Sequence, residues 1–250
     1  MQRRNFLSSI VLSIGLIAGL ASAASGPASA ATPIQPGARI VSGSSACTMN
    51  FIYREVLPER ASTSGRRTRS SSTSTTTRPR LFAGTAGHCV SGVGARVKID
   101  DTSFGTVAFH RLNDDAGQDF AFIEIDRDKE RLVNPSMLGF DGPNGTISGS
   151  EAQPGDGVHV YGNGLVFGES ELTRPRSGFL NDANGQFYRA TLPVIFGDSG
   201  GPVLHEDGSA LGIVAHLTVA TDLTTLDGNT VEYALGVARA NGLNLEVVPG

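Results

Sequence analysis

The octapeptide FGDSGGPV, residues 196–203, combines one serine with three glycines, an aspartate and a proline. Glycine is needed where the backbone adopts positive φ or approaches a neighbour closely. Three glycines within eight residues are more than a simple turn requires. The stretch also satisfies the G-x-S-x-G pattern of serine nucleophiles. Ser199 is therefore a candidate nucleophile, and the flanking sequence must indicate which scaffold carries it.

The sequence after Ser199 argues against an α/β-hydrolase. In that scaffold the serine lies at a strand-to-helix turn, and an aspartate and then a histidine follow it in the chain. Here a Gly-Gly-Pro tripeptide follows, which is a poor helix start, and only His205 and His216 come later. The 17 residues from Ser199 to His216 leave no room for the intervening strands and helices.

The chain after residue 80 consists of short apolar runs separated by Gly, Asn and Asp turns. Their length and their β-branched and aromatic residues favour strands over helices. VEYALGVARANGLN, 231–244, is the best helix candidate and ends at Gly242, although its first half also fits a last strand. The sequence predicts an all-β protein with one C-terminal helix, and the Gly-rich residues 141–150 are the predicted linker between two halves. The predicted strand runs are LFAGTAG (81–87), ARVKID (95–100), GTVAFHRL (105–112), DFAFIEID (119–126), GVHVYG (157–162), GQFYRATLPVIF (185–196), GPVLHE (201–206) and ALGIVAHLTVA (210–220).

Two segments supply partners for Ser199. In LFAGTAGHC a strand leads into a small-residue turn that carries His88, and in GQDFAFIEI the carboxylate of Asp119 heads an apolar strand, where it needs a polar partner. Asp114 and Asp115 lie in a turn sequence, in which aspartate is common. With TAGHC, DFAFIEI and GDSGGP in this order, the chain resembles the chymotrypsin-like serine proteases, in particular the secreted bacterial members.

The resemblance implies two packed antiparallel six-stranded β-barrels, at 40–140 and 150–250, with the active site in the cleft between them. It implies that His88 is the general base, that Asp119 orients it and that Ser199 is the nucleophile. The backbone N–H groups of Gly197 and Ser199 would form the oxyanion hole, for a peptide or protein substrate and without a cofactor. The histidines outside this pattern are interpreted as structural or surface residues; they are His110, His159, His205 and His216.

By the same resemblance, the specificity pocket is lined by the residues before Ser199 and by the strand after it. The candidates are Pro193, Phe196, Ala215, His216 and Leu217. Trypsin-like enzymes carry an aspartate where this chain has Pro193, so cleavage after Arg or Lys is not expected. We predict a small or medium apolar residue before the scissile bond; the alternative is glutamate, with His216 as its binding group.

The resemblance also implies that Asp198 is buried and neutralised by a positive group. ARIVSG, 38–43, resembles an activation site at which cleavage would free the amine of Ile40. Only six residues separate Ile40 from Cys47, and seven residue steps span about 25 Å at most. The spacing therefore argues against a new N-terminus as the partner of Asp198, and the resemblance to the bacterial members implies an arginine in its place.

The N-terminus predicts export. Residues 1–30 combine a basic start, an apolar run and two A-x-A cleavage signals, which indicates a signal peptide rather than a membrane anchor. RRNFL also resembles a twin-arginine signal. Residues 31–39 are predicted to form a short disordered leader. The mature protein is expected to be secreted, free of the membrane and monomeric.

Charge is unevenly distributed along the chain. Residues 1–80 contain ten arginines and two glutamates, a net charge of +8, whereas residues 81–250 contain ten basic and 22 acidic residues, a net charge of −12. An acidic body argues against a nucleic-acid partner. Residues 59–80 are rich in Ser, Thr and Arg, and we interpret them as a solvated loop, with a polybasic binding patch as the alternative.

The chain contains two cysteines, Cys47 and Cys89. An exported chain meets oxidising conditions, so one disulfide is expected between them. A metal site is not expected, because two cysteines 42 positions apart lack ligand spacing. The leading hypothesis is a secreted serine endopeptidase; the alternatives are a catalytically weak homologue that binds peptides or a surface, and an esterase on the same scaffold.

Overall fold

The structure is a computed structural model that describes residues 31–58, 78–165, 168, 170, 172–217 and 225–250. The chain divides into a unit of Met1–Ala31 and a unit of Thr32–Gly250, and every described strand and helix lies in the second unit. The predicted signal peptide and residues 59–77 of the predicted loop lie outside the described residues.

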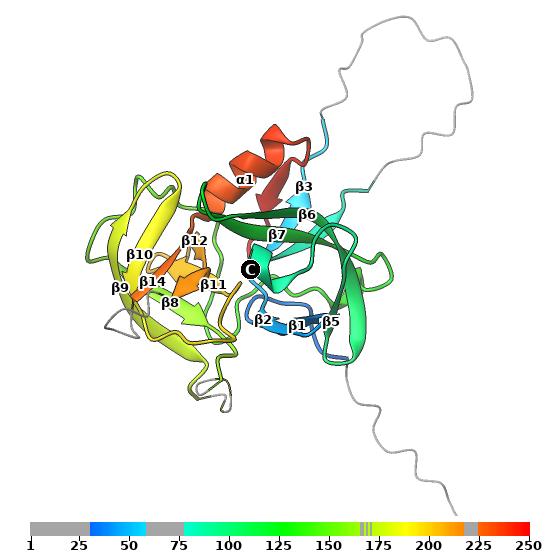
Figure 1. Cartoon of the computed structure of the whole chain (residues 1–250), viewed down its shortest axis with the longest axis horizontal. Helices are drawn as coiled ribbons and strands as arrows, with labels where there is room; N and C mark the ends of the chain where they lie inside the picture. Colours follow the sequence, from blue (N-terminus) through cyan, green and yellow to red (C-terminus); the bar gives the residue numbers. More distant parts are fainter. Residues whose placement is uncertain (1–30, 59–77, 166–167, 169, 171, 218–224) are drawn as a thin grey trace, which may run out of the picture. The chain divides into compact units, whose positions relative to one another are not determined.

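The first sheet is antiparallel and contains eight strands among the described residues, in the order β15-β3-β4-β7-β6-β5-β1-β2 (Figure 1). Alternate residues of β7 enter two different cores, because successive side chains of a strand point to opposite faces. Phe120 and Phe122 belong to a core shared with the C-terminal helix, whereas Ala121, Ile123 and Ile125 fill the inner core of the sheet. The strands are β1 (Arg39–Ser42), β2 (Ser45–Thr48), β3 (Ile52–Glu55), β4 (Leu81–Thr85), β5 (Arg96–Ile99), β6 (Thr102–Asn113), β7 (Gln118–Ile125) and β15 (Leu245–Val247).

The second sheet is also antiparallel, with seven strands in the described part and the order β12-β11-β8-β9-β10-β14-β13. Its inner core includes Val158, Leu180, Tyr188, Val203 and Leu226. The two curled sheets confirm the predicted two-barrel, all-β fold, with eight and seven strands rather than six each. The strands are β8 (Gly157–Tyr161), β9 (Pro175–Ala183), β10 (Phe187–Thr191), β11 (Pro202–His205), β12 (Ala210–Ile213), β13 (His216–Leu217) and β14 (Thr225–Asn229).

The predicted C-terminal helix is present as α1 (Val231–Ala240). Thr230 caps its N-terminus by accepting a hydrogen bond from the Tyr233 N–H, and Gly242 follows its end with a φ of 87°. No helix in the described part is both long and apolar enough to cross a membrane. The described residues also contain the 3-10 turns η1 (Gly87–Cys89) and η2 (Glu130–Leu132). The buried residues of α1, which recur at helical spacing, are Val231, Ala234, Leu235 and Ala238.

The segment before β1 differs from the disordered leader predicted for 31–39. Ile34 is 1% exposed, forms a bridge with Val133 and exchanges backbone hydrogen bonds with Leu132 and Asn134. Its burial in the inner core of the first sheet provides the apolar contact that orders this segment. Residues 32–38 are therefore part of the folded body.

Residues 141–150, the predicted linker, lie between η2 and β8 in the chain. Ile147 and Ala210 are joined through a backbone hydrogen bond, and Gly145 accepts one from Ala210.

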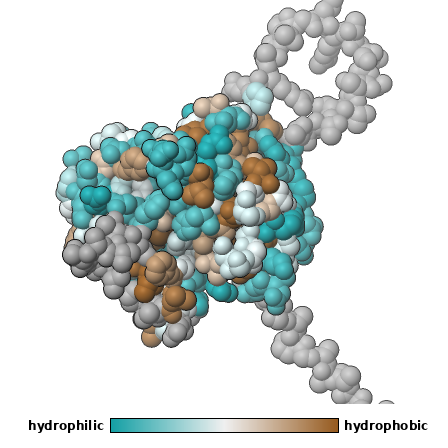
Figure 2. All heavy atoms as spheres, viewed as in Figure 1, coloured by the Kyte–Doolittle hydropathy of each residue, from teal (hydrophilic) through white to brown (hydrophobic). Residues whose placement is uncertain are grey.

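Figure 2 shows a largely hydrophilic face with an apolar area at its lower left. Exposed apolar side chains of the described residues include Leu165, Leu172, Phe179 and Phe196.

Candidate active site

The structure brings His88 and Asp119 into direct contact. His88 lies in η1, directly after β4, and Asp119 is the second residue of β7, which pairs with β4. The Asp119 carboxylate is 1% exposed, and its Oδ2 lies 2.6 Å from His88 Nδ1 while its Oδ1 accepts from the His88 backbone N–H at 2.9 Å. A Cβ at Gly87 would lie 2.1 Å from the Arg111 carbonyl oxygen, so only glycine fits at this turn. One carboxylate thus fixes both the ring and the backbone of the histidine.

The contact with Asp119 changes the acidity of the imidazole. The hydrogen bond to the carboxylate raises the pKa of His88 above its ordinary value of 6.5, while partial burial acts in the opposite direction. The charged imidazolium form of His88 is therefore stabilised at this position. A general base needs this property, because it becomes charged when it takes a proton.

Asn229 is a further partner of Asp119 that the sequence analysis did not identify. Its Oδ1 accepts from the Asp119 backbone N–H at 2.9 Å, and its Nδ2 donates to the Gly117 carbonyl oxygen at 2.9 Å. Asn229 is 1% exposed and ends β14 of the second sheet. It therefore attaches the start of β7, in the first sheet, to the second sheet. Its sequence neighbourhood, LDGNT, resembles an ordinary turn and gives no signal of this role.

The loop that carries Ser199 packs directly on the histidine turn. The Ser199 carbonyl oxygen accepts from the Thr48 N–H at 2.9 Å and lies 3.6 Å from Cys89 Sγ. Gly200 has a φ of 82°, and a Cβ there would lie 2.1 Å from Thr85 Oγ1 and 2.8 Å from the Ala86 nitrogen. The glycine after the serine therefore permits the close approach of the two segments.

Gly197 has a backbone conformation that suits an oxyanion hole. Its φ is 102°, and the carbonyl oxygen of the preceding Phe196 accepts from the Leu165 N–H at 2.9 Å. In a trans peptide the N–H points opposite to the carbonyl, so the Gly197 N–H points away from Leu165. Among the described residues, neither the Gly197 N–H nor the Ser199 N–H has an acceptor.

Asp198 is paired with an arginine, as expected, and the structure identifies it as Arg176. Both residues are buried, at 0% and 8% exposure. Arg176 Nη1 and Nη2 donate to the two carboxylate oxygens at 2.7 Å each, and the N–H groups of Gly164 and Ile195 donate to the same carboxylate at 2.8 Å. Ile40 instead lies inside β1, opposite Cys47, and is 1% exposed. The charge of Asp198 is thus neutralised without a new N-terminus.

The predicted disulfide Cys47–Cys89 is present and joins β2 to η1, next to His88. The sulfur atoms of both cysteines and a nitrogen of His88 lie within 4.8 Å of one another. This cluster cannot act as a metal site, because disulfide sulfurs are not thiolates. The disulfide instead connects the turn that carries the histidine to the hairpin that supports the serine loop.

The candidates for the specificity pocket lie in different surroundings. Ala215 is buried, and the Pro193 carbonyl oxygen accepts from Arg176 at 2.9 Å. His216 Nε2 lies 4.0 Å from Asp119 Oδ2, with its side chain 56% exposed. Phe196 lies beside Gly197 in a cavity of about 200 Å³ that Cys47 also lines. Leu217 ends β13, and its side chain lies outside the described residues.

The remaining histidines contact structural partners. His110 Nε2 lies 3.1 Å from the Gly87 carbonyl oxygen, and His159 stacks on Phe140 with ring centroids 4.9 Å apart. Burial opposes the charged form of His205, yet hydrogen bonds to Asp156 and Asp207 raise its pKa.

Comparisons with known proteins find the fold in solved structures only. No protein family model and no curated protein matches the chain. Thermobifida fusca protease A is 23% identical, over 87% of this chain and 99% of that one, with a TM-score of 0.54. Nocardiopsis protease is 18% identical, over 86% and 98% of the two chains, with a TM-score of 0.57. A glutamic-acid-specific serine protease that uses a histidine triad in substrate binding is 17% identical, over 86% and 100%, with a TM-score of 0.56. The chain thus has the two-barrel fold of the bacterial chymotrypsin-like serine proteases.

Proposed function

We propose that the protein is a secreted serine endopeptidase that works through an acyl-enzyme. The observation that carries this proposal is the bidentate contact of the buried Asp119 with His88, beside a serine loop whose Asp198 is already neutralised by Arg176. The likeness to protease structures supports the fold on which this chemistry occurs. The Cys47–Cys89 disulfide supports an oxidising, extracellular location.

In the proposed reaction, His88 Nε2 takes the hydroxyl proton of Ser199 while Oγ attacks the substrate carbonyl carbon. The carbonyl oxygen becomes an oxyanion, which the N–H groups of Gly197 and Ser199 stabilise. Collapse breaks the peptide bond, and His88 gives its proton to the leaving amine. Water then attacks the acyl-enzyme by the same route, which releases the acid and restores the serine. Asp119 accepts from Nδ1, so that Nε2 is free to act as the base.

The proposed substrate is a polypeptide with a small or medium apolar residue before the scissile bond. The absence of an acidic group at Pro193 supports this choice over a basic residue. The glutamate alternative assigns the acid-binding role to His216, whose side chain is 56% exposed. Cleavage of a peptide library decides between the two, and dominant cutting after Arg would contradict both.

Reaction with a fluorophosphonate tests the proposal directly. The mature wild-type protein should lose fluoride from the reagent and gain a phosphonyl ester at Ser199, located by peptide mass spectrometry, and it should cleave a protein substrate. Ser199→Ala should lower kcat on the order of a millionfold and abolish labelling. Labelling without peptide cleavage would favour the esterase, and a folded wild type that is not labelled would favour the binding homologue.

A further inference from the structure

A groove starts at the proposed oxyanion hole and leads away from the serine. Its first part is the cavity of about 200 Å³ between the loop of Phe196 and Gly197 and the β1–β2 hairpin, where Arg39 and Cys47 lie. A second cavity of about 320 Å³ shares Arg39 and Asn163 with the first. The two cavities therefore adjoin at these two residues, and together they are called the groove below.

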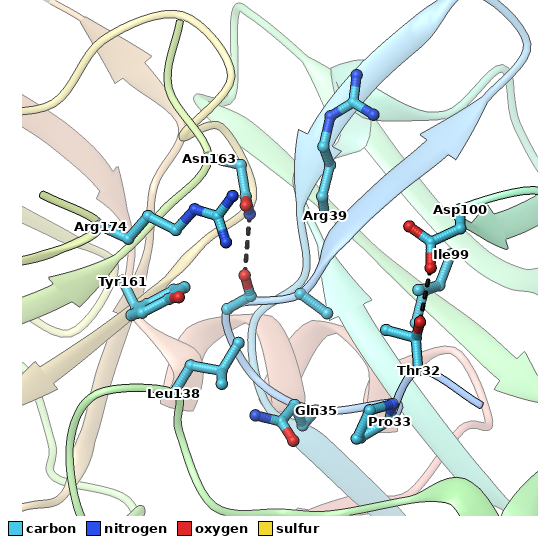
Figure 3. Close-up of a pocket in the computed structure, with 12 residues that line it drawn as sticks. Thr32, Pro33, Gln35, Arg39, Ile99, Asp100, Leu138, Tyr161, Asn163 and Arg174 are labelled. Atoms are coloured by element: carbon cyan, nitrogen blue, oxygen red, sulfur yellow. Dashed lines mark hydrogen bonds between the residues drawn. The ribbon is translucent and has the colours of Figure 1, made fainter. Parts of the chain in front are cut away.

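Figure 3 shows how the second cavity is built between the two sheets. Arg174 and Asn163, from the second half of the chain, lie on one side, and Arg39 of β1 and Asp100 of the β5–β6 turn lie on the other. Asp100 Oδ2 accepts from the Thr32 hydroxyl at 2.6 Å, so the acidic group of this cavity already has a donor.

The wall of the groove is connected to the proposed oxyanion hole by hydrogen bonds. Asn163 N–H and Nδ2 both donate to Thr48 Oγ1 at 3.1 Å, and Thr48 Oγ1 donates to the Gly197 carbonyl oxygen at 2.9 Å. Asn163 Nδ2 also donates to the Gly37 carbonyl oxygen at 2.9 Å. A ligand in the groove therefore meets a surface that is held in place relative to Gly197.

Arg39 gives the first cavity of this groove its charge. It is exposed and is the one charged residue that lines the first cavity. Other exposed arginines, such as Arg54 and Arg96, are paired with carboxylates, whereas Arg39 has no carboxylate partner within the described part of the chain. An uncompensated cation at the edge of a cleft attracts anionic ligands and disfavours cationic ones.

We propose that this groove binds the part of the substrate that follows the scissile bond, and that Arg39 makes an acidic side chain preferred there. The inference rests on the proposed endopeptidase function. Ala215 and His216 are assigned to the residues before the scissile bond, so the extended chain beyond it runs along the other side of Ser199, where the groove begins. The 69% and 65% exposed side chains of Leu165 and Phe196 offer apolar contact to the stem of a glutamate.

Cleavage of a set of quenched fluorescent peptides tests this proposal. The peptides share every residue before the scissile bond and differ after it, with Glu, Gln or Lys at the first or the second position. At about 20 mM salt the wild type should prefer Glu over Lys by about fivefold in kcat/KM, at one or both positions, and the preference should shrink at about 0.5 M salt, because exposed charges are screened. Arg39→Gln should remove the preference, and Arg39→Glu should reverse it. Active enzyme is counted in every sample by fluorophosphonate titration, so partial misfolding does not alter the ratios.

Arg54→Gln is the matched control, because Arg54 is an exposed arginine of the same sheet outside both cavities. It should keep the wild-type ratios. A wild type that cleaves these peptides with equal kcat/KM for Glu, Gln and Lys would overturn the inference, and so would Arg39 variants with unchanged ratios. A wild type that cleaves none of them and is not labelled would instead overturn the proposed function.

Discussion

The Asp119 carboxylate illustrates how much a single residue determines in this site. Both of its oxygens are used by one histidine, Oδ2 by the ring and Oδ1 by the backbone. The ring contact requires a hydrogen on Nδ1, which leaves Nε2 as the basic nitrogen. The backbone contact holds the main chain of His88, and therefore the point from which its side chain extends. Removal of the charge therefore affects the tautomer and the acidity of His88 more than its position.

Asp119→Asn should lower kcat on the order of ten-thousandfold at neutral pH, because an amide that donates to Nδ1 favours the wrong tautomer. The measurement is peptide hydrolysis with active-site titration. Asp115→Asn is the matched control, since Asp115 lies in the exposed turn between β6 and β7 and should leave kcat within about twofold. The opposite ranking of the two variants would show that Asp119 is not the orienting residue.

The raised pKa of His88 predicts the acid limit of activity. Only neutral His88 can accept the Ser199 proton, so kcat/KM should fall as the pH drops through a midpoint above 6.5. Stability should respond in the opposite sense. The contribution of the His88–Asp119 contact is complete below the unfolded pKa and is lost as the pH rises through the raised folded value. A pH–rate profile for kcat/KM checks the first statement, and a midpoint below 6.5 would contradict it.

Residues that act at a distance along the chain could not be predicted from the sequence. The serine and histidine segments were recognisable because close backbone approach forces small residues around them, as at Gly87 and Gly200. Asn229 and Arg176 carry no such local mark, since their partners come from other strands. The resemblance to the bacterial members implied an arginine partner for Asp198, but it did not indicate which arginine.

At the scale of elements, strands buried on both faces were predicted well. The buried residues 120–123 of β7 and 203–204 of β11 are apolar and uninterrupted by turn residues, and β4 contains Gly84 as its one turn residue. In contrast, β9 reads PRSGFLNDA and contains Pro, Gly, Asn and Asp, which favour turns. It is a central strand because Pro175 occupies its first position, where no ladder donor is needed, and because β8 and β10 pair with its two edges.

β9 also carries Arg176, so the ion pair with Asp198 joins this strand to the serine loop. Arg176→Met leaves a buried carboxylate without its cation, and the free energy of unfolding should fall by about 3–5 kcal/mol. Activity should fall as well, because the loop that presents Gly197 and Ser199 loses its anchor. Urea denaturation with a peptide assay measures both effects.

Arg189→Met provides the comparison, because Arg189 forms an exposed ion pair with Asp227 on the same sheet. Exposed pairs contribute about 0–1 kcal/mol, so this variant should unfold nearly as the wild type does. Equal effects of the two substitutions would mean that the buried pair has no special role in holding the serine loop.

At the scale of the whole molecule, the end of the chain returns to its beginning. β15 pairs with β3 in the first sheet, and α1 packs on Phe120 and Phe122 of β7. The predicted division into barrels at 40–140 and 150–250 assigned both elements to the second half. The strand β15 has three residues, which is too short for recognition from sequence periodicity. Its pairing with β3, some 190 positions earlier, is set by tertiary contacts.

Removal of residues 244–250 should therefore destabilise the first sheet, although these residues are distant from it in sequence. Leu245 and Val247 are buried, at 1% and 8% exposure, and each contributes about 1.5–3 kcal/mol on burial. Loss of both, together with the pairing to β3, is a large part of the roughly 5–15 kcal/mol that stabilises a typical domain. The truncated protein should unfold at a much lower urea concentration, or should not fold at all. Removal of Pro249 and Gly250 alone is the control and should change the midpoint little, since both are exposed and only one backbone hydrogen bond, from the Gly250 N–H to the Pro143 carbonyl oxygen, is lost. If the longer truncation unfolded at the wild-type midpoint, the return of the chain to the first sheet would make no contribution to its stability.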